Sequence, residues 1–293
     1  MRAFGNYMDD ERGLSPHTIA GRCWFVRKFL DHIVQNGQEL RALNVGQIDE
    51  FLAWQGCHGY SRRSTATYVS ALRSFFKYGE RQGWCRPGVA VAIAGPRLYR
   101  DESLPVGPSW ADVRRLLATT QTNRPTDIRD RAILLLFATY GLRAGEVRCL
   151  QLDDLDWDRE RINLRRPKQR CADTYPLVRS VGDAILRYLT KVRPRVSDRT
   201  LFLTLKRPYR PLGCGAIWPL VGERLRKMEI ALPHSGPHCL RHSCASRLLS
   251  KGFSLKQIAD HFGHRSLETT RIYAKVDLPA LRRVANFGLG GVL

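Results

Sequence analysis

The sequence of 293 residues lacks the features that mark membrane and exported proteins. No apolar run approaches the roughly 18 to 20 residues of a membrane-spanning helix. The N-terminal stretch MRAFGNYMDD has no apolar core of a signal peptide. The eight cysteines are scattered and form no CxxC pair, which is typical of reduced thiols rather than of a disulfide framework. We therefore expect a cytoplasmic protein with no membrane partner.

Two kinds of catalytic motif are also missing. The sequence contains no phosphate-binding loop of the GxxxxGK[ST] type, so nucleotide hydrolysis is not indicated. No carboxylate cluster is evident that would hold two metal ions at a phosphodiester. These absences predict a protein that works without cofactor or metal.

Acidic residues are scarce relative to basic ones. Asp and Glu number 27 against 48 Lys and Arg, which gives a net charge of +21 and a pI near 10.2. Such an excess is self-repulsive in a folded chain unless a polyanion neutralises it, and nucleic acid is the first candidate. Basic membrane binders instead concentrate their charge in one tail or helix, whereas here it is spread along the chain.

Residues 1–95 are predicted to form a helical domain. Ser15 and Pro16 are typical of a helix start, and apolar residues then recur at helical spacing until Gly37. Further helices are expected over 47–56 and 61–83, with basic side chains on their outer faces. These side chains are either merely solvated or contact nucleic acid. With two residues of the second domain, the candidate nucleic-acid contacts are Arg62, Arg63, Arg73, Lys77, Arg170 and Arg265.

A stretch rich in proline and glycine, 96–108, is predicted to link this domain to a second one over 109–293. The second domain is expected to be mainly helical, with two strands at 161–164 and 174–178, a hairpin loop between them and a short extended segment at 200–204. The fold class is therefore mainly α with a small β-sheet or hairpin in the second domain. Its helices are expected over 110–120, 127–141, 215–228, 237–252, 254–263 and 266–276.

The first candidate site residue follows a buried apolar helix directly. Arg143, in GLRAGEV, is thus held by a rigid element, and Glu146 three residues later could orient its guanidinium on a helix. The alternative is an ordinary surface ion pair.

A second group lies in PHCLRHSC. His238, Arg241 and His242 share one helix face near a helix start, which favours an anion site. Zinc binding by these histidines with Cys239 and Cys244 is the alternative. It is disfavoured because Cys239 lies about 100° around the helix from His238 and because no matching second half exists.

The remaining candidates are Lys168, at the tip of the hairpin, and His264 and Tyr273 in HFGHRSLETTRIYAKV. A helical tyrosine more often fills a core than attacks a substrate. Two arginines, two histidines, a lysine and a tyrosine nevertheless form a set that can stabilise negative charge and move protons around one hydroxyl. On a strongly basic chain this set indicates metal-free chemistry on a nucleic-acid phosphodiester.

The order of these motifs resembles that of the tyrosine recombinases, also called the phage integrase family. Successive intervals are 25 residues from Arg143 to Lys168, 70 to His238, 3 to Arg241, 23 to His264 and 9 to Tyr273. The chain is most similar to compact Xer-type and mobile-element members. The resemblance covers essentially the whole chain, because ERGLSPHTIAGRCWFVRKFLDHI resembles the start of the family's core-binding domain.

The resemblance implies a two-domain DNA clamp in which Tyr273 attacks the scissile phosphate and forms a 3′-phosphotyrosyl link. Arg143 and Arg241 would clamp the non-bridging oxygens, His264 would hydrogen-bond the phosphate, and Glu146 would position Arg143. The covalent link conserves the energy of the phosphodiester, so that neither ATP nor a metal is required.

The family also implies the groups that move protons. Lys168 would protonate the leaving 5′-oxygen, and His238 would be the general base towards the tyrosine. Lys168 and Arg170 could exchange roles if the register of the hairpin differs.

Assembly on double-stranded DNA is implied as well, with a dimer at each site, a tetrameric synapse and attack by Tyr273 within its own subunit. A related recombinase is an alternative partner. Residues 277–293 are expected either to dock on a neighbouring protomer or to fold back. Two other functions remain open, a topoisomerase IB-like relaxing enzyme and a catalytically silent DNA-binding protein. The short two-domain form favours a nucleoid-associated recombinase of a mobile element or of the Xer type.

Overall fold

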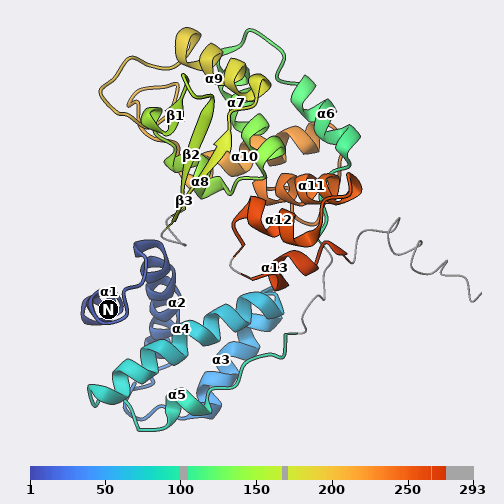
Figure 1. The fold of residues 1–293 in the computed structure, drawn as a ribbon. Helices are drawn as coiled ribbons and strands as arrows, with labels where there is room; N and C mark the ends of the chain where they lie inside the picture. The colour runs from blue at the N-terminus through green and yellow to red at the C-terminus, as the bar shows by residue number, and fades with distance from the viewer. Residues whose placement is uncertain (99–104, 167–170, 265, 275–293) are drawn as a thin grey trace, which may run out of the picture. The chain divides into compact units, whose positions relative to one another are not determined.

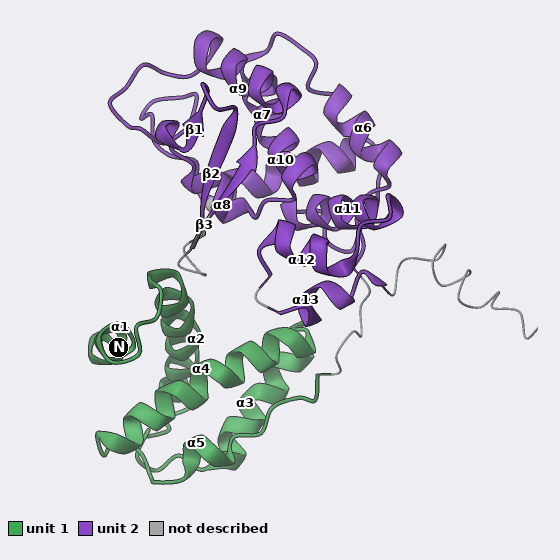
Figure 2. Cartoon of the chain, in the orientation of Figure 1, with its two compact units in different colours: residues 1–102 green, residues 103–293 purple. Residues whose placement is uncertain are grey.

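The computed structural model describes residues 1–98, 105–166, 171–264 and 266–274. It divides into two compact units, residues 1–102 and 103–293 (Figure 2). In the described chain, no helix is both long and apolar enough to cross a membrane. The predicted limits of 1–95, 96–108 and 109–293 for the domains and their linker stay a prediction.

The described part of unit 1 is helical (Figure 1). Aromatic side chains make up a large part of its core. Its elements are α1 (Arg2–Asp10), α2 (Pro16–Gln35), α3 (Val45–Cys57), α4 (Arg62–Arg81) and α5 (Val89–Ala92). The Ser15 hydroxyl accepts a hydrogen bond from the Thr18 backbone N–H and begins α2, as the Ser-Pro pair predicts. Helix α4 buries Tyr68, Leu72 and Phe76 completely, which leaves its basic residues on the outside.

Unit 2 surrounds a long buried helix. Its elements are α6 (Trp110–Ala118), α7 (Pro125–Tyr140), α8 (Ala144–Cys149), η1 (Leu152–Asp154), β1 (Leu155–Asp156), β2 (Arg161–Arg166), β3 (Cys171–Pro176), α9 (Arg179–Lys191), α10 (Cys214–Lys227), α11 (Pro237–Ser250), α12 (Leu255–Phe262) and α13 (Glu268–Arg271). Helix α7 is apolar on nearly every side because α9, α11 and α6 pack around it. The mainly helical fold with a small sheet confirms the predicted fold class.

The sheet is antiparallel, with the order β1-β2-β3. Ile162 and Leu164 of β2 are buried and alternate with outward-facing neighbours, as expected for a half-buried strand. The Tyr140 hydroxyl, at the end of α7, donates to the Pro176 carbonyl at 2.7 Å and accepts the Val178 N–H at 2.9 Å. The sheet is therefore attached to the end of the buried helix, next to Arg143.

Several sequence expectations differ from the structure, and β1 adds a third strand to the two that were predicted. The extended segment 200–204 forms only isolated bridges, Gln151 with Thr200 and Leu203 with Pro211. Helix α9 lies where no helix was predicted. Of the helix expected over 266–276, the described part, which ends at residue 274, contains α-helix only in α13, whose first turn includes a hydrogen bond from the Glu268 N–H to the Ser266 hydroxyl.

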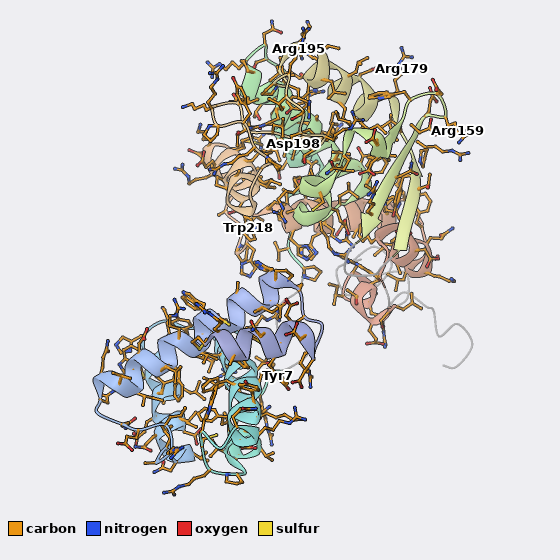
Figure 3. The ribbon with its side chains drawn as sticks, turned by 90° about the vertical axis from the view of Figure 1, so that its left-hand side faces the viewer. Tyr7, Arg159, Arg179, Arg195, Asp198 and Trp218 are labelled. Atoms are coloured by element: carbon orange, nitrogen blue, oxygen red, sulfur yellow. The ribbon has the colours of Figure 1, made fainter. Side chains whose placement is uncertain are left out.

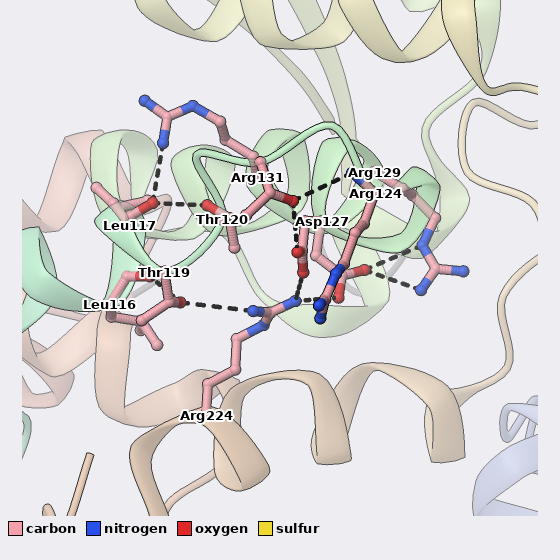
Figure 4. A network of polar contacts seen from close by, with 11 residues as sticks. Leu116, Leu117, Thr119, Thr120, Arg124, Asp127, Arg129, Arg131 and Arg224 are labelled. Atoms are coloured by element: carbon pink, nitrogen blue, oxygen red, sulfur yellow. Dashed lines mark hydrogen bonds and ion pairs between the residues drawn. The ribbon is translucent and has the colours of Figure 1, made fainter. Parts of the chain in front are cut away.

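Arginine side chains project from the surface of unit 2. Arg159, Arg179 and Arg195 point outward in Figure 3, and all three are exposed. Other arginines are enclosed instead. Figure 4 shows Arg224 of α10 reaching Asp127 of α7, with an N–O distance of 2.7 Å. The same guanidinium nitrogen lies 2.9 Å from a carboxylate oxygen of Asp130.

Candidate active site

Helix α11 places three polar side chains on one face while its other faces are buried. Cys239 and Leu240 belong to the main core of unit 2, and Cys244 and Ala245 belong to a second apolar cluster. Pro237 begins the helix at a position where its missing N–H costs no hydrogen bond. The helix is thus held on both sides, which fixes the directions of His238, Arg241 and His242.

Arg241 is only 1% exposed. Its Nη1 donates to the Gly141 carbonyl at 2.5 Å, and its Nη2 donates to the Phe262 carbonyl at 3.0 Å. The Phe262 ring lies against the guanidinium, with 4.2 Å between Cζ and the ring centroid. A buried unpaired charge would be costly, and these carbonyls compensate it because they are the ends of α7 and α12, where the backbone has oxygens without helical partners.

The same guanidinium determines the tautomer of His264. Nη2 of Arg241 lies 2.8 Å from Nε2 of His264. An arginine can only donate, so Nε2 is the acceptor and the proton of the neutral ring is on Nδ1. That proton faces the Thr270 hydroxyl oxygen at 2.7 Å. His264 therefore joins Arg241 to the segment that carries Tyr273.

Arg143 stands at the start of α8, where Glu146 accepts two of its hydrogen bonds. The backbone N–H of Arg143 donates to Oε2 at 2.8 Å, and its Nη1 donates to Oε1 at 2.7 Å. The carboxylate is 7% exposed, whereas about a third of the Arg143 side chain faces solvent. One edge of this guanidinium is thus fixed by Glu146, and the side chain remains accessible to an anion.

Tyr273 lies just after α13 and is 2% exposed. Its ring packs in the second apolar cluster, with Ala245, Ile258 and Phe262. Burial raises the pKa of its hydroxyl to about 12, with Arg241 and Arg143 acting in the opposite direction. The phenol is therefore protonated at neutral pH although two cations are near.

The hydroxyl of Tyr273 lies 3.0 Å from Nδ1 of His242. Burial, followed by the nearby His238, Arg241 and His234, lowers the pKa of His242 to about 4. The rings of His242 and His238 meet edge to face, with centroids 4.5 Å apart. His238 is exposed at the helix surface, yet desolvation by the surrounding chain, followed by Arg241 and Arg143, lowers its pKa.

The structure thus brings together five predicted site residues and Glu146. Arg143, His238, Arg241, His264 and Tyr273 come from α8, α11 and the segments after α12 and α13. Lys168, Arg170 and Arg265 lie outside the described residues, as does the predicted docking tail.

The candidate DNA contacts of unit 1 all lie on α4. Arg62, Arg63, Arg73 and Lys77 are exposed. Arg73 has an internal partner as well, because its Nε and Nη2 donate to the Ile93 carbonyl at 3.0 and 2.7 Å and so attach α4 to the end of α5. Its side chain therefore also has a structural role.

His242 is the functional candidate that the sequence did not single out for a role. The spacing places it on the face of His238 and Arg241, but its contact with Tyr273 joins residues 31 apart. Only the packing of the segment after α13 against α11 creates this pair. Cys239, by contrast, is buried in the core, and among the described residues no three potential metal ligands converge.

The arrangement combines a buried tyrosine hydroxyl with two cations that the chain holds in place. Arg241 is held by backbone carbonyls and Arg143 by a carboxylate, so neither needs to reorganise when an anion binds. His242, with a lowered pKa, offers a neutral ring to the hydroxyl. Such a site suits transfer of a phosphoryl group to a tyrosine.

Comparison with known proteins identifies the family. Residues 110–278 match the model of the phage integrase family, and residues 1–83 match its N-terminal SAM-like domain. A putative integrase/recombinase of Sinorhizobium fredii, y4rA, is 37% identical over 97% of this chain and 69% of its own length. Tyrosine recombinase XerA of Thermococcus kodakarensis is 34% identical over 96% of this chain and 92% of its own length.

Solved structures show the same fold. XerH site-specific recombinase bound to a palindromic difH substrate superposes with a TM-score of 0.75 at 20% identity, over 94% of this chain and 81% of that one. The Tn1549 transposon integrase in complex with a circular intermediate DNA gives 0.69 at 19% identity, over 92% and 93%. With the matched family and relatives, these findings show that the chain belongs to the phage integrase family, the tyrosine recombinases that cut and rejoin DNA.

Proposed function

We propose that this recombinase cuts and rejoins DNA through Tyr273, in a site made of Arg143, His238, Arg241 and His264. The observation that supports this assignment best is the position of one phenol hydroxyl beside a neutral histidine, with Arg241 and Arg143 near enough to affect its pKa. The matched relatives are integrases and recombinases, which favours strand exchange over the relaxing and catalytically silent alternatives.

In the proposed reaction, the Tyr273 oxygen forms a bond to phosphorus while the bond from phosphorus to the 5′-oxygen breaks. A histidine of α11 takes the phenol proton, and Lys168 supplies a proton to the leaving 5′-oxygen. The 3′-phosphotyrosyl link keeps the energy of the phosphodiester, and the reverse step rejoins a strand.

Arg143 and Arg241 stabilise the charge that grows on the non-bridging oxygens in the transition state. Because both guanidiniums are already held by the chain, this stabilisation requires little reorganisation. His264 holds Arg241 through its Nε2 lone pair. To donate a hydrogen bond to a phosphate, Nε2 of His264 must itself carry a proton. His264 can therefore bind the phosphate in this way only when its ring is protonated or has turned over.

The proposed substrate is duplex DNA, with a dimer on each site and a tetramer in the synapse. The net charge of +21 supports a polyanionic partner, and the XerH and Tn1549 integrase structures are of those proteins with DNA. We propose the nucleoid as the location of such an enzyme. The candidate contacts on α4, and Arg170 and Arg265, belong to this proposal.

A suicide substrate tests the central assignment. This DNA duplex carries a nick near the cleavage point, so that the short product diffuses away and the covalent complex accumulates. The wild type should form a covalent complex that survives denaturing electrophoresis. Tyr273→Phe should form none but should bind the duplex with unchanged affinity. Covalent capture by the phenylalanine variant would show that another side chain is the nucleophile.

A further inference from the structure

We propose that His242, and not His238, receives the proton of the Tyr273 hydroxyl during attack on the phosphate. This inference rests on the proposed function and adds a catalytic residue to it. It concerns a side chain that touches the reacting oxygen itself.

The contact geometry distinguishes the two histidines. Nδ1 of His242 lies 3.0 Å from the Tyr273 hydroxyl oxygen, a normal hydrogen-bond distance. His238 lies one helical turn earlier, is exposed, and meets the edge of the His242 ring. Since Tyr273 is 2% exposed, water has little access to its hydroxyl, and His242 is the acceptor already in place.

The groups around His242 keep its ring able to accept a proton. His238, Arg241 and His234 disfavour a second proton on this ring, and the Tyr273 ring packs beside it with centroids 5.6 Å apart. A protonated imidazole has no lone pair and could not accept from the phenol. The neutral ring, with its proton on Nε2, presents the Nδ1 lone pair to the hydroxyl.

The acidities of the two groups determine when the proton moves. The phenol, with a pKa of about 12, keeps its proton before attack, because the imidazole pKa is about 4. As the oxygen bonds to phosphorus, its proton becomes strongly acidic, and the O–H bond breaks towards Nδ1. The incoming phosphate also brings a negative charge, which favours the imidazolium. Rejoining returns this proton from His242 to the tyrosine oxygen.

His242→Asn tests the proposal, because the asparagine amide lies near the place of Nδ1 but is not a base. We expect single-turnover cleavage of the suicide substrate by this variant to be about 10² to 10⁴-fold slower at pH 7. Without the imidazole, the proton must leave to hydroxide. The rate constant should then rise about tenfold per pH unit between pH 7 and 9, whereas that of the wild type should be nearly flat.

His238→Asn is the matched control, one turn away on the same helix face. It should keep the flat pH profile, whatever its effect on the absolute rate. DNA affinity within twofold of the wild type shows that each variant is folded, and His242→Gln replaces an asparagine variant that fails this check. A flat profile for the His242 variant, or the steep one for His238→Asn, would overturn the proposal. If the wild type formed no covalent complex at all, the proposed function would fail instead.

Discussion

Gly141 joins the end of α7 to the buried guanidinium of Arg241. Its φ of +61° lies in the left-handed region, which a glycine adopts without strain and which turns its carbonyl towards Nη1. A Cβ atom at this position would lie 2.5 Å from a ring carbon of Phe262, the residue that stacks on the same guanidinium. The sequence predicts the helix end at Gly141, but this contact arises only from the packing of α12.

Gly141→Ala should therefore destabilise the chain by about 2 kcal/mol or more, from backbone strain together with overpacking. We also expect the rate of covalent trapping to fall, because Arg241 loses its position. Urea unfolding and the suicide substrate measure the two effects.

Gly145→Ala provides the control for Gly141→Ala. Gly145 lies in α8 without a left-handed φ, and no atom lies within 4 Å of the place that an alanine methyl would take. Alanine favours a helix, so this variant should be more stable by about 0.5 to 1 kcal/mol. Equal stability of the two alanine variants would refute the role given to Gly141.

Single residues differ in how far the sequence reveals them. The Arg143–Glu146 pair is local, three residues apart, so helical geometry alone predicts it. Arg143, Arg241 and Tyr273 can be picked out of the sequence because their order resembles that of the motifs of the tyrosine recombinases. The His242–Tyr273 bond spans 31 residues and depends on tertiary packing, which no local pattern encodes.

At the scale of elements, a buried ion-pair network connects α7 to α10. Arg224 donates to Asp127 and Asp130, and all three side chains are less than a fifth exposed. The Arg224 guanidinium holds the pKa of the Asp127 carboxyl below its usual value even though burial opposes this shift. Figure 4 shows how the network lies along α7, with Thr119 also in contact with Arg224.

Arg224→Met should cost about 3 kcal/mol, because it leaves the buried carboxylate of Asp127 without its cation and leaves Asp130 paired with Arg129 alone. Chemical unfolding at pH 7 gives this value. The comparison is Arg199→Met, which breaks an exposed pair with Asp153 whose side chains are about 60% accessible. Exposed pairs contribute little, so this variant should lose much less stability than Arg224→Met. Similar losses in both variants would contradict the argument from burial.

Most elements are evident in the sequence because their start signals and periodicities agree. Helix α12 has both, with Ser254 at its cap and Gly263 at its end. Helix α9 was missed although Val181, Ala184, Ile185 and Tyr188 follow a helical spacing. The extended segment predicted at 200–204 has buried apolar residues, as a strand would have. Its backbone forms only isolated bridges, so it is not a strand of the sheet.

For the whole molecule, the lowered pKa of His242 predicts a loss of stability in acid. Because the folded state disfavours its protonation, the stabilisation is complete above the ordinary pKa of 6.5 and is lost as pH falls towards about 4. The loss amounts to at most about 3 kcal/mol. His238 is shifted in the same direction. Urea unfolding at pH 7.5 and 4.5 should show a larger decrease for the wild type than for His242→Gln.

The other titratable groups, such as His238, are present in both proteins, so the difference reports the contribution of His242. An identical decrease in the two proteins would mean that His242 accepts its proton as easily when folded as when unfolded.

The burial of Tyr273 also affects what happens when the chain binds DNA that does not contain its recombination site. A chain with 48 basic residues adheres to any stretch of chromosome, and nearly all of these encounters are at wrong sequences. Because Tyr273, the proposed nucleophile, is 2% exposed, adhesion alone would not bring it to a phosphate. Searching for a site and breaking a strand would then be separate events, so that binding to non-specific DNA would not by itself lead to cleavage.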